Sequence, residues 1–94
     1  MHTFRKLKVW RRAMDFVVDI YQVSAGFPRS EQFGLTSQVR RAATSIPLNV
    51  AEGAGCSSNP EFRRFLGYAQ RSAYEVMTGL EIARRLGYCC PDRT

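Results

Sequence analysis

A stripe of polar side chains within residues 35–54 contains residue types that take part in catalysis. The stripe recurs at spacings of three and four, the period of one helix face. Its members are Arg41, Ser45, Asn49 and Glu52, and residues 60–86 add Ser72 and Glu75. A serine in such a set could act as a nucleophile if a nearby base accepted its proton. The same residues could instead form an interhelical hydrogen-bond network or contact a neighbouring subunit, because an unsatisfied buried polar group costs about 1–3 kcal/mol.

The chain lacks the groups that would complete a catalytic or metal site. Its single histidine, His2, falls in the expected N-terminal tail, so the serines have no imidazole base on a helix. Gly53-Ala54-Gly55 lacks the lysine and serine of a phosphate-binding loop. Cys56, Cys89 and Cys90 fit no metal or redox spacing. We therefore predict a protein that is not an enzyme and that binds no metal or cofactor.

Positive charge is the dominant feature of the composition. Fourteen Lys and Arg against eight Asp and Glu give a net charge of +6. Such an excess favours an anionic partner such as nucleic acid, without specifying a sequence. Four arginine pairs carry much of the charge: Arg11-Arg12, Arg40-Arg41, Arg63-Arg64 and Arg84-Arg85.

Three amphipathic helices must position these groups. Apolar residues recur at spacings of three and four in three segments, which predicts helices at about residues 7–25, 35–54 and 60–86. In the middle helix the stripe consists of Leu35, Val39, Ala42, Ala43, Ile46 and Val50. Pro47 lies inside this helix and should kink it without breaking it, because the apolar period continues beyond it.

Local signals set the ends of the helices. Gly26 and Pro28 end the first one. Asn59 is the predicted N-cap of the third helix, with Pro60 at its first position, and Gly87 closes it.

The predicted fold is all-α, because no segment shows sustained strand alternation. Residues 1–94 suffice for one domain, with a short irregular tail at 87–94. Short links make successive helices antiparallel, as in an up-down bundle. Three such helices leave an apolar groove that the tail is too short to fill, and a second copy of the chain is its simplest occupant.

This topology gathers seven basic residues at the end of the bundle where the first and third helices begin. They are Arg5, Lys6, Lys8, Arg11, Arg12, Arg63 and Arg64. We expect them to contact phosphates, helped by the unpaired N–H groups of two helix N-termini. Solubility, together with pairing to Glu52 and Glu61, is the alternative explanation.

No apolar run approaches the roughly 20 residues needed to cross a bilayer. The basic N-terminus is not followed by an apolar segment long enough for a signal peptide. We therefore expect a cytoplasmic protein without a membrane role.

Several short segments match a known family pattern in the right order. They are Phe4–Trp10, Phe27-Pro28 with Glu31, most of Phe33–Gly53, Glu61-Phe62, Phe65-Leu66, Ala69, Ser72, Glu75 and Leu86-Gly87-Tyr88. On these residues the chain resembles the bacterial four-helix-bundle proteins encoded in 23S rRNA intervening sequences. The resemblance implies an up-down bundle, often a ring-like pentamer. A related branch serves as the accessory variability protein of diversity-generating retroelements, where a basic barrel engages a reverse transcriptase and nucleic acid.

The chain departs from this pattern after Leu86-Gly87-Tyr88, where the family continues with another helix. We therefore expect a bundle of the four-helix type with three long helices and a truncated fourth, arising from a truncated or frameshifted gene or from a natural variant. The predicted function is a non-enzymatic homo-oligomer that binds RNA or other nucleic acid through phosphate contacts. The alternative is a protein-interaction scaffold or an accessory subunit of a reverse transcriptase, with no direct nucleic-acid role.

Overall fold

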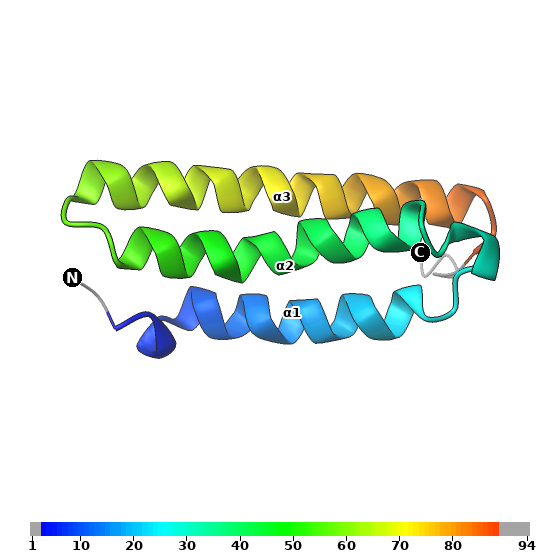
Figure 1. Cartoon of the computed structure of the whole chain (residues 1–94), viewed down its shortest axis with the longest axis horizontal. Coiled ribbons are helices and arrows are strands. Elements are labelled where there is room, and N and C mark those ends of the chain that lie inside the picture. Colours follow the sequence, from blue (N-terminus) through cyan, green and yellow to red (C-terminus); the bar gives the residue numbers. More distant parts are fainter. Residues whose placement is uncertain (1–2, 89–94) are drawn as a thin grey trace, which may run out of the picture.

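A computed structural model describes residues 3–88, which form three long helices joined by short links (Figure 1). The helices are α1 (Lys8–Ser24), α2 (Leu35–Ala54) and α3 (Asn59–Arg85). Two 3₁₀ turns accompany them, η1 (Phe4–Lys6) before α1 and η2 (Arg29–Glu31) before α2. The all-α prediction is confirmed, and each helix boundary lies within one residue of its predicted place.

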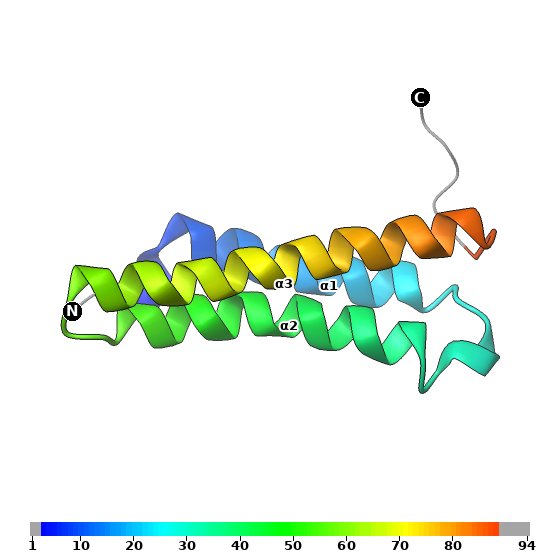
Figure 2. The same ribbon diagram turned by 90° about the horizontal axis from the view of Figure 1, so that it is seen from above.

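The three helices alternate in direction, and α2 lies between the other two (Figure 1). Both α1 and α3 pack against α2, whereas within residues 3–88 no Cα atom of α1 comes within 8 Å of one in α3. Seen from above, α1 and α3 lie on the same side of α2 (Figure 2). The described residues therefore form an open V with α2 at its apex. They contain no fourth helix, and the predicted tail lies outside them beyond Tyr88.

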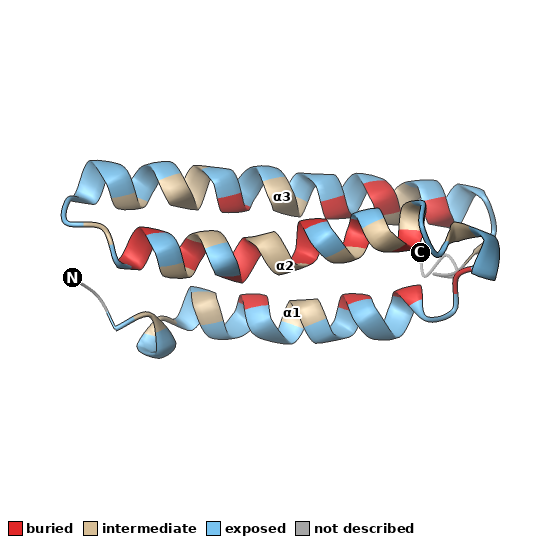
Figure 3. Ribbon diagram, viewed as in Figure 1, coloured by how far each residue is buried: buried red, intermediate tan, exposed pale blue. Residues whose placement is uncertain are grey.

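The core lies along the faces where α1 and α3 meet α2 (Figure 3). Two clusters of buried residues make it up: Ile20, Phe27, Val39, Ala42, Ala43, Val76 and Ala83 in one, and Ala13, Ile46, Val50 and Ala69 in the other. The predicted α2 stripe is thus buried, apart from the half-buried Leu35. Pro47 is buried too, and α2 continues through it.

Two glycines allow α2 and α3 to approach closely. A Cβ atom on Gly79 would lie 2.5 Å from Cγ1 of Val39. One on Gly53 would lie 2.8 Å from both Phe62 Cδ1 and Phe65 Cβ. Any side chain at these positions would push the helices apart, so this close contact depends on glycine.

The start of α3 corrects one prediction. Ser58, and not Asn59, is the N-cap, because its Oγ accepts a hydrogen bond from the Glu61 N–H at 3.3 Å. The Ser58 hydroxyl also donates a hydrogen bond to Glu61 Oε1 at 3.2 Å, which holds the side chain of Glu61 beside the cap. Asn59 is the first helical residue and Pro60 the second.

Gly87 ends α3 as predicted. Its φ of 77° is in the left-handed region that favours glycine. The N–H of Gly87 donates to the carbonyl of Arg84 at 3.0 Å, and that of Tyr88 to Ala83 at 2.9 Å. These two bonds form a Schellman motif, which satisfies carbonyls left open at the helix end.

Glu31 joins the start of α2 to the segment that follows α3. Its carboxylate accepts hydrogen bonds from the Leu35 N–H and the Tyr88 hydroxyl, each at 2.9 Å. The Leu35 bond is the main reason that the pKa of Glu31 is lowered, and the Tyr88 bond adds to it. The same bond raises the pKa of Tyr88. A Cβ atom on Gly34 would lie 2.6 Å from Glu31 Oε1, so glycine leaves room for this cap.

Candidate nucleic-acid interface

The seven predicted phosphate contacts lie at one end of the molecule, at the left of Figure 1, where α1 and α3 begin. All seven residues are exposed, and together they are called the basic end: Arg5, Lys6, Lys8, Arg11, Arg12, Arg63 and Arg64. The first two belong to η1, the next three to the first turns of α1, and the last two to the start of α3. Antiparallel packing places the start of α3 at the same end of the molecule as η1 and the start of α1, although α3 is far from them in the sequence.

No residue of the basic end forms an ion pair with a carboxylate in the described part of the chain. Within residues 3–88, the ion pairs are those that Glu81 makes with Arg84 at 2.6 Å and with Arg85 at 2.8 Å, near the opposite end of α3. Hydrogen bonds from these two guanidinium groups lower the pKa of Glu81 to about 2. Neither Glu52 nor Glu61 pairs with a residue of the basic end, so their predicted neutralising role is not seen in the described chain.

The two helix N-termini at this end differ, contrary to the prediction that both present open N–H groups. The α3 terminus is capped by Ser58 and carries the negative charge of Glu61 in its first turn. The α1 terminus has Leu7 at the N-cap position and no side-chain cap. The Ser58 cap thus uses one N–H donor of α3 that an anion would otherwise bind, whereas no side chain caps the start of α1.

The predicted polar network forms only in part. The hydroxyls of Ser45 and Ser72 share a hydrogen bond that links α2 to α3. The Asn49 side-chain amide donates to the Ser45 carbonyl at 2.8 Å, and the Ser45 hydroxyl lies 2.8 Å from the carbonyl of Ala42. The Ser45–Ser72 bond therefore helps to fix the register of α2 against α3, while Asn49 bonds within α2.

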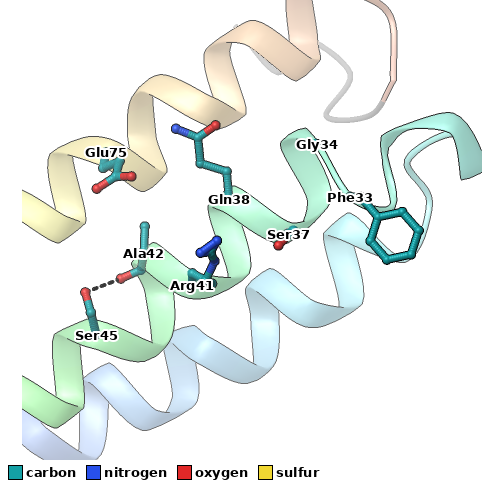
Figure 4. A pocket seen from close by; sticks show the side chains of 8 residues that line it. All are labelled: Phe33, Gly34, Ser37, Gln38, Arg41, Ala42, Ser45 and Glu75. Atoms are coloured by element: carbon teal, nitrogen blue, oxygen red, sulfur yellow. Dashed lines mark hydrogen bonds between the residues drawn. The ribbon is translucent and has the colours of Figure 1, made fainter.

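Arg41, Glu52 and Glu75 stay outside this network. All three are exposed, and their charged groups make no hydrogen bond or ion pair within residues 3–88. Arg41 and Glu75 border a hollow of about 510 Å³ on the outer side of α2 and α3 (Figure 4). Ser45 also lines it, as do Phe33, Gly34, Ser37, Gln38 and Ala42.

Arg40 is a structural residue that the sequence analysis missed. Its Nε donates to Ser24 Oγ at 2.7 Å, and its Nη2 donates to the Tyr21 carbonyl at 3.2 Å. The guanidinium also lies 4.6 Å from the centroid of the Tyr21 ring. Arg40 therefore ties the end of α1 to α2, where helix carbonyls attract a cation.

The sequence model of the 23S rRNA-intervening sequence proteins matches residues 5–94. The chain belongs to this family. No curated protein matches the sequence. The match includes the whole basic end of this 23S rRNA-intervening sequence protein, together with Ser45, Asn49 and Ser72.

The described part of this 23S rRNA-intervening sequence protein has no group of three or more His, Cys, Asp and Glu that could hold a metal ion. His2, Cys89 and Cys90 lie outside the described residues. Within residues 3–88, no helix has both the length and the apolar character needed to span a membrane.

Proposed function

We propose that this family member is a non-enzymatic, self-associating helical bundle that binds RNA or other nucleic acid through phosphate contacts. The observation that carries the proposal is the basic end, seven exposed cations without a carboxylate partner in the described chain. Lysine and arginine side chains that are not already paired can displace the counterions of a phosphate backbone. Because phosphate contacts carry no sequence information, the expected binding is salt-sensitive and weakly specific.

Anisotropy of a labelled RNA, measured over a salt series, tests this function. The association constant should fall with rising salt, with a log–log slope of about 0.7 to 0.9 for each phosphate contact. The double variant Arg11→Ala, Arg12→Ala should weaken binding and reduce this slope. Its melting temperature should change little, because both side chains are exposed.

The matched control is Arg84→Ala, Arg85→Ala, which removes the same charge from the opposite end of α3. Both guanidinium groups already pair with Glu81, so this variant should lose less affinity. Failure to bind RNA at low salt would contradict the proposed function. Equal losses in the two double variants would show that net charge, and not the basic end, determines binding.

Self-association is supported by the apolar inside of the V. A hollow of about 520 Å³ opens there, lined by Val9 of α1, by Ile46 and Val50 of α2, and by Leu66 and Ala73 of α3. Val9 remains 49% exposed although it faces this hollow. Apolar surface of this kind favours burial against another helix. We propose that copies of the chain supply it in a homo-oligomer, a pentamer in the assembly that the family resemblance implies.

A second function, a protein-interaction scaffold or an accessory subunit of a reverse transcriptase, is favoured by Phe33. This ring is 91% exposed in the turn before α2, and together with Arg41 it lines the hollow of about 510 Å³ on the outer side of α2 and α3. A large exposed aromatic ring beside a guanidinium suits a protein partner. Size-exclusion chromatography with a purified reverse transcriptase would test it: a complex lost in Phe33→Ala supports this function, and no complex with the wild-type chain argues against it.

A further inference from the structure

The outer side of α3 carries two aromatic rings in contact, flanked by two guanidinium groups, next to the basic end. The Arg64 guanidinium lies 5.3 Å from the centroid of the Phe65 ring. The Phe65 and Tyr68 rings meet edge to face, with centroids 5.5 Å apart and planes at 86°. The Arg71 guanidinium lies 5.8 Å from the centroid of the Tyr68 ring. These four residues are called the α3 ladder.

The two arginines of the ladder contact rings although carboxylates are within reach along the helix. Glu75 stands four residues after Arg71, and Glu61 three residues before Arg64, spacings at which helical ion pairs form. Neither pair forms within residues 3–88. A guanidinium that lies over a ring keeps its in-plane N–H donors for other acceptors. The ladder therefore presents free donors beside aromatic surface, a combination absent from the paired Arg84 and Arg85.

The ladder is accessible and continuous with the basic end. Arg64, Tyr68 and Arg71 are spaced by four and three residues, so they share one helix face, and Arg64 itself belongs to the basic end. Tyr68 is 37% exposed, while Phe65 is half-buried beneath it. The carboxylates of Glu61 and Glu75 flank the ladder along α3, which confines a phosphate-binding path to the two turns between them.

We propose that the α3 ladder is a stacking platform that makes the protein prefer single-stranded nucleic acid to duplex. Unpaired bases stack on the exposed part of Tyr68 and on the guanidinium planes, while Arg64 and Arg71 contact the phosphates on either side. A duplex keeps its bases stacked inside and offers only its phosphates to this surface. The inference rests on the proposed function, because it names the class of nucleic acid that this surface recognises.

Anisotropy with a labelled unstructured oligonucleotide, and with its duplex of equal length, tests the preference. The wild-type chain should bind the single strand more tightly. Tyr68→Ala should weaken single-strand binding about tenfold, the effect of losing one base–aromatic stack, and should leave duplex binding nearly unchanged. Tyr68→Phe should keep the preference, because the ring remains.

Two further variants separate stacking from charge and from general damage. Arg71→Ala should lower the log–log salt slope for the single strand by about 0.7, the value for one phosphate contact, whereas Tyr68→Ala should leave that slope unchanged. Tyr74→Ala is the matched control, since its ring is 58% exposed on α3 but lies outside the ladder. It should bind both probes as the wild type does.

The outcomes separate the stacking platform from the phosphate-binding function on which it rests. Equal affinity for single strand and duplex, or equal losses for both probes in Tyr68→Ala, would overturn the stacking platform and leave the phosphate-binding function standing. Binding of neither probe at low salt would overturn both.

Discussion

The paired arginines of this chain differ in what holds their side chains, although the four pairs look alike in the sequence. Arg40 is fixed by Ser24 and the Tyr21 carbonyl. Arg84 is fixed by Glu81. Arg11, by contrast, is exposed and has no ion pair in the described chain. The role of each arginine thus follows from its neighbours in space: structural in the first two cases, and available to an external anion in the third.

Replacing Arg40 tests its structural role. Arg40→Ala should lower the free energy of unfolding by about 1–3 kcal/mol, because the Ser24 hydroxyl and the Tyr21 carbonyl both lose a charged donor. Arg41→Ala is the natural control, since the guanidinium of this neighbour is exposed and makes no ion pair with any residue of 3–88, and it should change stability by less than about 0.5 kcal/mol. Urea denaturation of the two variants measures the difference. If Arg40→Ala lowered the free energy of unfolding as little as Arg41→Ala, Arg40 would not have the structural role described.

At the scale of the helices, the contact between α2 and α3 depends on having no side chain at Gly79. Alanine is the better helix former by about 1 kcal/mol, yet its Cβ would lie 2.5 Å from the stiff, branched side chain of Val39. Gly79→Ala should therefore destabilise the protein by about 1–3 kcal/mol.

Gly67 provides the contrast on the same helix, because a Cβ atom there would meet nothing within 4 Å. Gly67→Ala should stabilise by up to about 1 kcal/mol through helix propensity alone. Thermal melting of both variants measures the pair of effects. If the two substitutions shifted the melting temperature in the same direction, the close approach at Gly79 would not limit the packing.

The Glu31 cap makes the junction between α2 and the end of α3 sensitive to pH. The folded state lowers the pKa of Glu31 below its usual 4.5 through the Leu35 and Tyr88 bonds. A lowered folded-state pKa gives stability that is present above 4.5 and lost as the pH falls through the folded value. Glu81, with a pKa of about 2, adds to the same loss of stability at acid pH.

Melting curves recorded from neutral to acid pH should therefore show a falling melting temperature below pH 4.5. Glu31→Gln should have a lower melting temperature than the wild type at neutral pH. Its melting temperature should fall less on acidification, because of these two carboxylates only Glu81 is then left to be protonated. The raised pKa of Tyr88 predicts a further loss of stability as the pH rises above 10. An unchanged acid profile in Glu31→Gln would show that the cap does not contribute.

For the whole molecule, the open V predicts concentration-dependent assembly. Met77 is 61% exposed. It stands four residues after Ala73, on the side of α3 that faces the hollow inside the V. Met77→Glu should shift sedimentation toward monomer, because burying an unpaired charge in an interface is costly. The wild-type chain should sediment as an oligomer at micromolar concentration. A folded wild-type monomer under these conditions would contradict self-association.

The sequence predicted the helices well, because their apolar period and their Gly and Pro residues are local signals. It misplaced the α3 cap since Ser58 and Asn59 are both good N-caps, although the three-residue spacing from Ser58 to Glu61 was available as a signal. Arg40 and Arg41 could not be told apart, because their roles depend on where α1 packs. The basic end followed from topology, whereas the ring contacts of Arg71 depend on side-chain conformations that no spacing specifies.

Within residues 3–88 no Cα atom of α1 lies within 8 Å of one in α3, so the backbone divides into an α2–α3 hairpin and a separate helix α1. The α2–α3 hairpin has the close glycine contacts and the serine hydrogen bond, whereas Arg40 is the main polar tie to α1. Local opening events follow such differences in contact. Release of α1 would expose the apolar side of the hairpin and at the same time separate the five basic residues of η1 and α1 from Arg63 and Arg64 of α3. Integrity of the first helix and recognition of an anionic partner are therefore energetically linked.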